Sequence, residues 1–184
     1  MPSTRPSIGY HILALVTIAV WGTTFVSTKV LLSHGLTPPE IMFYRFIIAY
    51  ALTWIFTRKV WADTWKDELL LALAGFTGGT LYFLAENTAL DYSITSNVAL
   101  VVCVTPVLTA LLTSLCYKER ITARLVVGSV VALSGVGFVV LNGTVLKIHP
   151  LGDALALVAA VAWAVYSVVI RRFDGCYTTW FVTR

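Results

Sequence analysis

Charged residues are scarce in this sequence. Asp, Glu, Lys and Arg make up 12% of the 184 residues and 58% are hydrophobic, whereas soluble domains carry about 25% charged residues. This shortage excludes an ordinary soluble domain, and no stretch between the apolar runs is long enough to form one. The basic residues lie in short clusters between those runs, so the net charge of +4 does not indicate a nucleic-acid partner.

Groups that carry enzyme or metal chemistry are also missing. The three cysteines form no CxxC pair and share no zinc spacing with histidine. We find no nucleophile beside a base and no phosphate-binding loop. The sequence therefore predicts no enzyme activity, no metal and no cofactor.

Long apolar runs dominate what is present. A helix needs about 20 apolar residues to cross the hydrocarbon of a membrane. The first run continues well past the h-region of about 7–15 residues that a signal peptide has, so we expect an uncleaved span. The tail at 177–184 begins a seventh run. We predict an all-α integral membrane protein with six transmembrane helices plus a partial seventh, the six lying at about 10–32, 40–57, 68–90, 94–117, 123–141 and 151–170.

Basic residues mark every second connection between these runs, with Lys147 as the exception. Loops rich in Lys and Arg stay on the cytoplasmic side. We therefore expect a cytoplasmic N-terminus in a protein of the cell membrane, specifically the bacterial inner membrane. The marking residues are Arg5, then Arg58, Lys59 and Lys66, then Lys118 and Arg120, then Arg171 and Arg172.

The sixth run repeats the first. Leu-Ala-Leu-Val at 13–16 returns at 155–158, and at the same offset Trp21 meets Trp163 and Lys29 meets Arg171. Five spans fill one period, and an odd period inverts the second copy, as in many secondary transporters. We expect one five-helix repeat over 1–145 and the start of an inverted second repeat over 146–184.

In the order and spacing of its motifs, the chain resembles the EamA branch of the drug/metabolite transporter superfamily. The likeness covers almost the entire chain. It is carried by the segments 14–16 with 21–25, 86–90 with 105–112 and 119–122, Gly128 and Gly135, and 152–154 with 162–166 and Arg171-Arg172.

This resemblance implies ten helices in two inverted repeats and transport of small metabolites, often export. The present chain departs from it, since the last three or four helices are missing. We therefore keep two hypotheses: a permease working by alternating access with a small-molecule substrate and protons, and a non-transporting membrane fragment or subunit. In either case a partner chain, a homo-oligomer or the missing C-terminal half would complete the assembly in the lipid bilayer.

The hairpin at 68–117 holds the leading site candidate. A short turn at Asp91-Tyr92-Ser93 joins its two runs, and Glu86 lies inside the first, with Tyr82 one turn earlier. A carboxylate inside a membrane is costly and usually functional. Two readings stay open: Glu86 exchanges protons, or it pairs with Lys29 or Arg45, which are themselves candidates for attracting an anionic substrate.

Aromatic and polar residues supply the other candidates. Aromatic side chains in the middle of a span either line a cavity or pack the helices. Polar residues recur along the fourth run, and this polar stripe either faces substrate or holds helices together. Pro106 removes a backbone hydrogen bond and predicts a kink or hinge, with a carbonyl freed near Val102. We expect Glu119-Arg120 to be a structural pair at the cytoplasmic end. The further candidates for binding are Trp21, Tyr44, Trp163 and Tyr166 among the rings, and Asn97 and Thr105 in the stripe.

Overall fold

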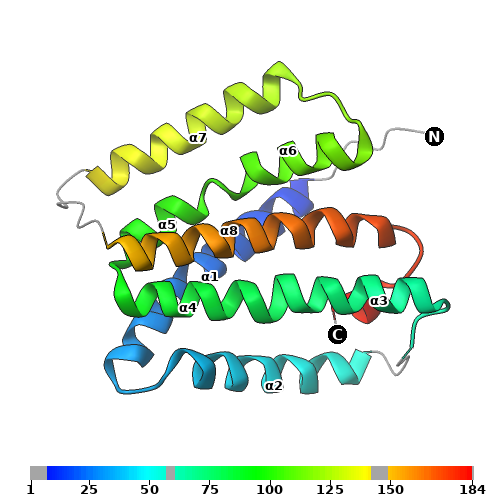
Figure 1. Cartoon of the computed structure of the whole chain (residues 1–184), viewed down its shortest axis with the longest axis horizontal. Helices are drawn as coiled ribbons and strands as arrows, with labels where there is room; N and C mark the ends of the chain where they lie inside the picture. The colour runs from blue at the N-terminus through cyan, green and yellow to red at the C-terminus, as the bar shows by residue number, and fades with distance from the viewer. Residues whose placement is uncertain (1–7, 57–60, 142–148, 184) are drawn as a thin grey trace.

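The structure is a computed structural model that describes residues 8–56, 61–141 and 149–183, and the described residues contain helices and no strand (Figure 1). Among the described residues, four long segments are single helices, while two are interrupted. The elements are α1 (Ile8–Ser33), α2 (Pro38–Phe56), α3 (Trp65–Ala74), the π-helix η1 (Gly75–Leu81), α4 (Tyr82–Tyr92), α5 (Thr95–Val102), α6 (Thr105–Tyr117), α7 (Ala123–Leu141), α8 (Pro150–Ile170), the 3-10 helix η2 (Arg171–Phe173) and α9 (Thr179–Thr183).

Five helical segments of the described chain are long and apolar enough to cross a membrane. They are Ile8–Ser33, Pro38–Phe56, Trp65–Tyr92, Thr95–Tyr117 and Pro150–Phe173, and a shorter apolar stretch, Ala123–Gly135, lies in α7. The predicted all-helical membrane fold is therefore confirmed. The count of six spans plus a partial seventh stays a prediction, since the tail contributes only α9. Arg5, Arg58, Lys59 and Lys147 lie outside the described residues.

Local capping signals place the helix starts where the sequence predicts them. Glu40 accepts from the backbone N–H of Thr37 at 2.8 Å and from its hydroxyl at 2.7 Å, in front of the two prolines that open α2. The Thr122 hydroxyl accepts from the N–H of Leu125 at the start of α7. Such bonds satisfy backbone donors that the first helical turn leaves unpaired. The hairpin turn is shorter than predicted, because α4 continues to Tyr92.

Helix α8 lies at the centre of the bundle, in contact with α3, η1, α4, α5 and α6. Figure 1 shows α3 and α4 along one side of it, α5 and α6 along the other, and α2 and α7 at the two outer edges. Helix α1 crosses behind and runs in the opposite direction to α8 (Figure 1). The antiparallel course of these two helices is what an inverted repeat requires.

Small side chains let α4 and α8 approach closely. Ala85 and Ala89 of α4 are buried, as are Ala156, Ala159 and Ala160 of α8. In lipid the hydrophobic effect does not drive helices together, so dispersion contacts between closely packed backbones must do so. The same packing brings Gly152 of α8 against Ser93, and Gly78 of η1 against the ring of Tyr166.

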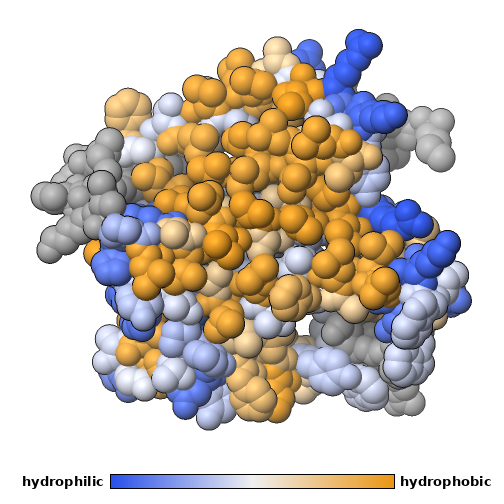
Figure 2. All heavy atoms as spheres, in the orientation of Figure 1, coloured by the Kyte–Doolittle hydropathy of each residue, from blue (hydrophilic) through white to orange (hydrophobic). Residues whose placement is uncertain are grey.

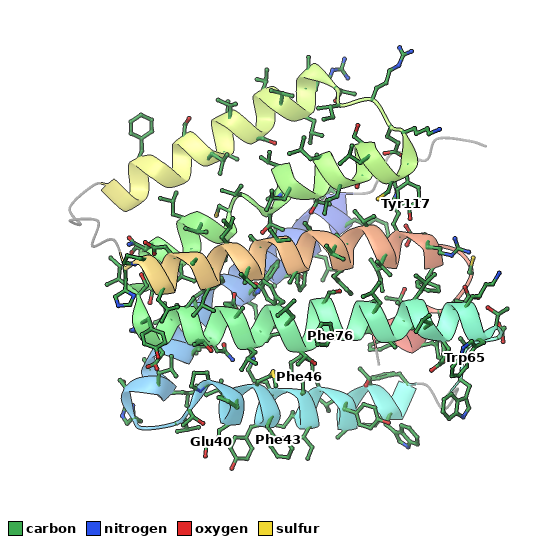
Figure 3. All side chains as sticks on the ribbon, in the orientation of Figure 1. Glu40, Phe43, Phe46, Trp65, Phe76 and Tyr117 are labelled. Carbon is green, nitrogen blue, oxygen red and sulfur yellow. The ribbon has the colours of Figure 1, made fainter. Side chains whose placement is uncertain are left out.

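The outer surface is apolar. Figure 2 shows hydrophobic residues across most of the face in view, with hydrophilic ones gathered towards its edges. Along α2, Phe43 points away from the bundle and is 60% exposed (Figure 3). Phe46 points towards α4, where the centre of its ring lies 5.3 Å from the centre of the Phe83 ring (Figure 3). An apolar side chain facing outward suits a surface solvated by lipid tails.

The Gly78 contact generates a stability prediction. A Cβ at position 78 would lie 2.4 Å from ring atoms of Tyr166, so Gly78→Ala must displace η1 or the ring. We expect a loss of about 1–3 kcal/mol, the usual cost of overpacking, seen as a lower midpoint of thermal unfolding in detergent. Gly75→Ala is the matched control, since nothing lies within 4 Å of its added Cβ. Equal midpoints for the two variants would contradict the close contact.

Candidate functional site

A buried carboxylate lies at the heart of the bundle. Glu86 is 3% exposed, and the Tyr82 hydroxyl donates to its Oε1 at 2.7 Å. Both residues lie on α4, one turn apart. The aromatic hydroxyl compensates part of the cost of burying the carboxylate. Among the described residues, no cation lies within ion-pair distance of Glu86, although the charge of Arg45 acts on it from α2.

The two predicted partners of Glu86 are engaged elsewhere. Lys29 Nζ donates to the carbonyl oxygen of Leu90, and to that of Ser93 at 3.1 Å. It therefore caps the C-terminal end of α4, where free carbonyls attract a cation. The guanidinium of Arg45 lies over the Phe83 ring, 4.9 Å from its centre. The expected pairing of Glu86 with Lys29 is wrong for this physical reason: the α4 carbonyls hold the ammonium.

Aromatic rings from three helices form a continuous cluster beside the carboxylate. Trp21 of α1 meets Trp163 of α8 with ring centres 5.2 Å apart. Trp163 also lies 4.7 Å from Tyr82 and 5.1 Å from Tyr166. The two tryptophans that the repeat relates to each other are thus in direct contact.

A cavity of about 840 Å³ opens in front of this cluster. Its size falls within the range typical of small-molecule sites, about 300–1,000 Å³. The two tryptophans and Tyr82 form one end, and hydroxyl-bearing residues follow along α5 and α6. The lining includes Ile18, Trp21, Gly22, Phe25 and Trp163 from α1 and α8, Thr95, Cys103, Thr105, Pro106, Thr109, Thr113 and Ser114 from the α5–α6 segment, and Glu119 and Arg120 beyond it.

The segment that lines this cavity is a broken helix. α5 ends at Val102 and α6 begins at Thr105, with Pro106 in its first turn. The Thr105 hydroxyl donates to the Val102 carbonyl at 2.6 Å, so the carbonyl freed by the proline has a neighbouring hydroxyl as its partner. Irregular backbone at membrane depth is tolerated where it is buried in protein or lines a water-filled cavity.

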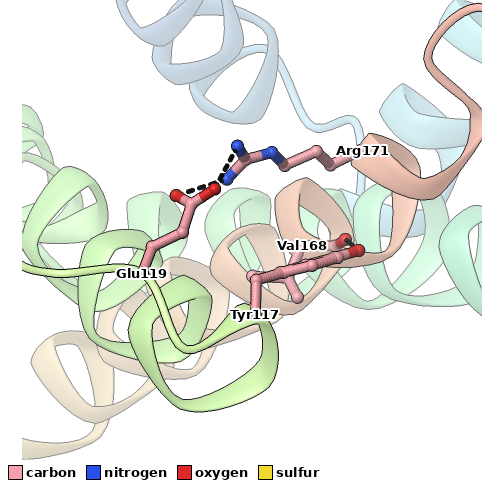
Figure 4. Close-up of polar contacts among 4 residues, drawn as sticks. All are labelled: Tyr117, Glu119, Val168 and Arg171. Carbon is pink, nitrogen blue, oxygen red and sulfur yellow. Dashed lines mark hydrogen bonds and ion pairs between the residues drawn. The ribbon is translucent and has the colours of Figure 1, made fainter.

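Beyond Glu119 and Arg120, which line the cavity, a different set of contacts joins the end of α6 to α8 and η2. Arg171 donates to both oxygens of Glu119, at 2.9 and 2.6 Å, and its guanidinium lies over the Tyr117 ring (Figure 4). The Tyr117 hydroxyl donates to the Val168 carbonyl at 3.0 Å. The expectation that Glu119 pairs with Arg120 is therefore corrected. The αL backbone of Lys118, φ 53°, turns the chain back, and Glu119 pairs with Arg171 beyond α8 instead.

This ion pair is formed at neutral pH. The hydrogen bonds from Arg171 hold the pKa of the Glu119 carboxyl below its usual range. A carboxyl with a lowered pKa contributes its stabilisation above its ordinary pKa, and loses it as the pH falls through the lowered value. Acid therefore weakens the pair.

The remaining predicted residues lie apart from the cavity. Tyr44 is 55% exposed on α2. Tyr166 packs on Gly78 behind Trp163, and Asn97 is buried on α5. The sequence prediction missed Phe25 and Cys103, although Cys103 stands two residues before the predicted stripe residue Thr105. In the described ranges, no three His, Cys, Asp or Glu side chains gather as a metal site would need.

Comparison with known proteins gives one consistent result. The chain is 29% identical to an uncharacterised transporter of Archaeoglobus fulgidus, and the match covers 86% of this chain and 56% of that relative. It is 30% identical to an uncharacterised transporter of Bacillus subtilis, and that match covers 84% of this chain and 53% of the relative. It is 25% identical to a probable terminal-alkyne amino-acid exporter of Streptantibioticus cattleyicolor, over 90% of this chain and 59% of the relative.

The chain thus spans about half the length of the curated relatives it matches. No solved structure matches it significantly. The profile of the EamA-like transporter family matches residues 8–141, which is most of the described chain. The apolar helices, the cavity between them and these matches agree, and the chain belongs to the EamA-like transporter family of membrane proteins.

Proposed function

We propose that this chain forms the core of a proton-coupled secondary transporter that exports small metabolites across the cytoplasmic membrane. The observation that carries this proposal is the cavity bounded by a broken helix and by Tyr82, whose hydroxyl donates to the buried Glu86. A discontinuous helix beside a midplane cavity is the usual place for a transporter's substrate. The N-terminus and the Glu119 end of the cavity face the cytoplasm in this proposal.

The Trp21–Trp163 contact supports the inverted repeat over 1–145 and 146–184. Residues related by a two-fold axis come into contact only where they lie close to that axis. Since these two rings are 5.2 Å apart, the axis would pass beside them, at the aromatic end of the cavity. Alternating access would then rock one repeat against the other around this point.

Completion of the cavity requires further helices in this proposal. The curated relatives are nearly twice as long as the matched region, so either additional helices of the same protein or a second copy would supply the opposite wall. A non-transporting fragment is the alternative, and it predicts no substrate-dependent proton movement under any condition.

Amino acids are the first substrates to test, because one relative is named as an amino-acid exporter. Proteoliposomes with trapped pyranine and an imposed pH gradient report proton movement on addition of each member of an amino-acid panel. We expect at least one to move protons in the wild-type chain. If the panel is silent, it is repeated with the chain coexpressed with any coding sequence that follows it. A panel that stays silent would favour the fragment alternative.

Glu86→Gln tests the coupling residue. The amide keeps the size of the side chain but cannot release a proton, so substrate-dependent proton flux should fall by about tenfold or more, equivalent to ~1.4 kcal/mol in the limiting barrier. Glu40→Gln is the matched control, since Glu40 caps α2 on the surface. Flux retained in Glu86→Gln, with the same pH profile as wild type, would remove Glu86 from the mechanism.

Trp163→Ala tests the aromatic end of the cavity. Loss of ring contacts worth about 0.5–1.5 kcal/mol should raise the half-saturating substrate concentration by about two- to tenfold. Trp163→Phe should recover part of this loss. Trp65→Ala is the control, because Trp65 is the first residue of α3 and its side chain is 79% exposed. An unchanged half-saturating concentration in Trp163→Ala would place substrate elsewhere.

A further inference from the structure

Three features of α6 coincide. Just before its start, the helical backbone is interrupted by a turn at Cys103 and Val104. At its end, Tyr117 and Glu119 are joined to α8 and η2 through Val168 and Arg171. Between these points runs α6 itself, which lines the cavity along one face.

We propose that α6 is the gate of the cavity, hinged at Cys103–Val104 and latched to the end of α8 by the Glu119–Arg171 pair and the Tyr117–Val168 hydrogen bond. Reading the cavity as a substrate route rests on the function proposed above. The gate itself rests on the contacts described here.

The geometry gives this segment a lever. The 13 residues of α6 span roughly 20 Å at 1.5 Å per residue. A small rotation at the broken backbone therefore becomes a displacement of several ångströms at Tyr117. Bending at the hinge does not have to break the backbone hydrogen bond at Pro106, because the proline has no N–H and has already removed that bond.

There is also space for the lever to enter. A second cavity of about 240 Å³ lies between α6 and α7, bounded by Val107, Ala110 and Leu111 on one side and Leu125 and Val126 on the other. These five side chains are apolar, and Ser129 of α7 adds one hydroxyl to the lining. Of the neighbouring helices, α7 packs mainly against α5 and α6.

The latch is suited to repeated opening. The side chains of Arg171 and Glu119 are 43% and 49% exposed, and water replaces the contacts of an exposed ion pair at little net cost. The α4–α8 contact, by contrast, is buried and made of closely packed alanines. Helix α6 itself packs against α8, so opening at the latch must also separate part of that contact, while the α4–α8 contact stays in place.

Cys103 provides a reporter inside the cavity. It lines the cavity at the hinge and is half-buried. In a Cys116→Ser, Cys176→Ser background it is the single thiol. The full chain in lipid nanodiscs is treated with a sulfonated maleimide at fixed pH, and the rate of Cys103 modification is measured without substrate or gradient.

Glu119→Gln should raise this rate by about two- to fivefold, the range expected for loss of one exposed ion pair. Reversing the pair, Glu119→Arg with Arg171→Glu, should return the rate towards that of the parent. Arg172→Gln is the matched control, since it removes the neighbouring charge and leaves the pair in place. Tyr117→Phe removes one hydroxyl and should give a smaller increase.

A Glu119→Gln rate equal to the parent's would overturn the proposal. So would a reversed pair that stays as fast as Glu119→Gln, because charge complementarity would then play no part. If Glu119→Gln does not elute as a folded protein, Tyr117→Phe decides in the same way: a faster rate supports the latch and an unchanged rate overturns it. Since no substrate is used, a silent amino-acid panel would count against the transport proposal without changing this result.

Discussion

The approach of α4 to α8 is the constraint on which the rest of the structure depends. Alanines on both helices, with Gly78 and Gly152 at the edges of the contact, bring the two backbones close together. This packing sets Tyr82 against Trp163, and the Tyr82 hydroxyl donates to the buried Glu86. Larger side chains along this contact would separate the helices and open the carboxylate to lipid, where an ionised group is costly.

Several buried polar groups find partners within the protein, because lipid offers them none. The Tyr82 hydroxyl serves the carboxylate, Lys29 serves the carbonyls at the end of α4, and Thr105 serves the carbonyl freed by Pro106. Each bond joins a costly group to the nearest available partner. The exposed pair at Glu119 differs, since its partners can exchange protein contacts for water.

Much of the fold follows from local signals. The apolar runs, the caps at Thr37 and Thr122 and the prolines that open α2 define helix positions within a few residues. Capping acts over one turn, and hydrophobic length acts over one span. The EamA resemblance is confirmed by the family match over residues 8–141. Of the site candidates, Trp21, Tyr82, Thr105 and Trp163 lie on one cavity, as their inward-facing positions indicate.

The sequence by itself determined a lipid-solvated helical protein of this family, because length, apolarity and motif spacing are one-dimensional properties. Only the tertiary structure decided the partners. Lys29 binds carbonyls 61 and 64 residues away and not Glu86, and Glu119 reaches across 52 residues to Arg171 and not to its neighbour Arg120. Charges of either sign have several acceptable partners in sequence, and the packing of α4, α6 and α8 selects which of them lies within hydrogen-bonding distance.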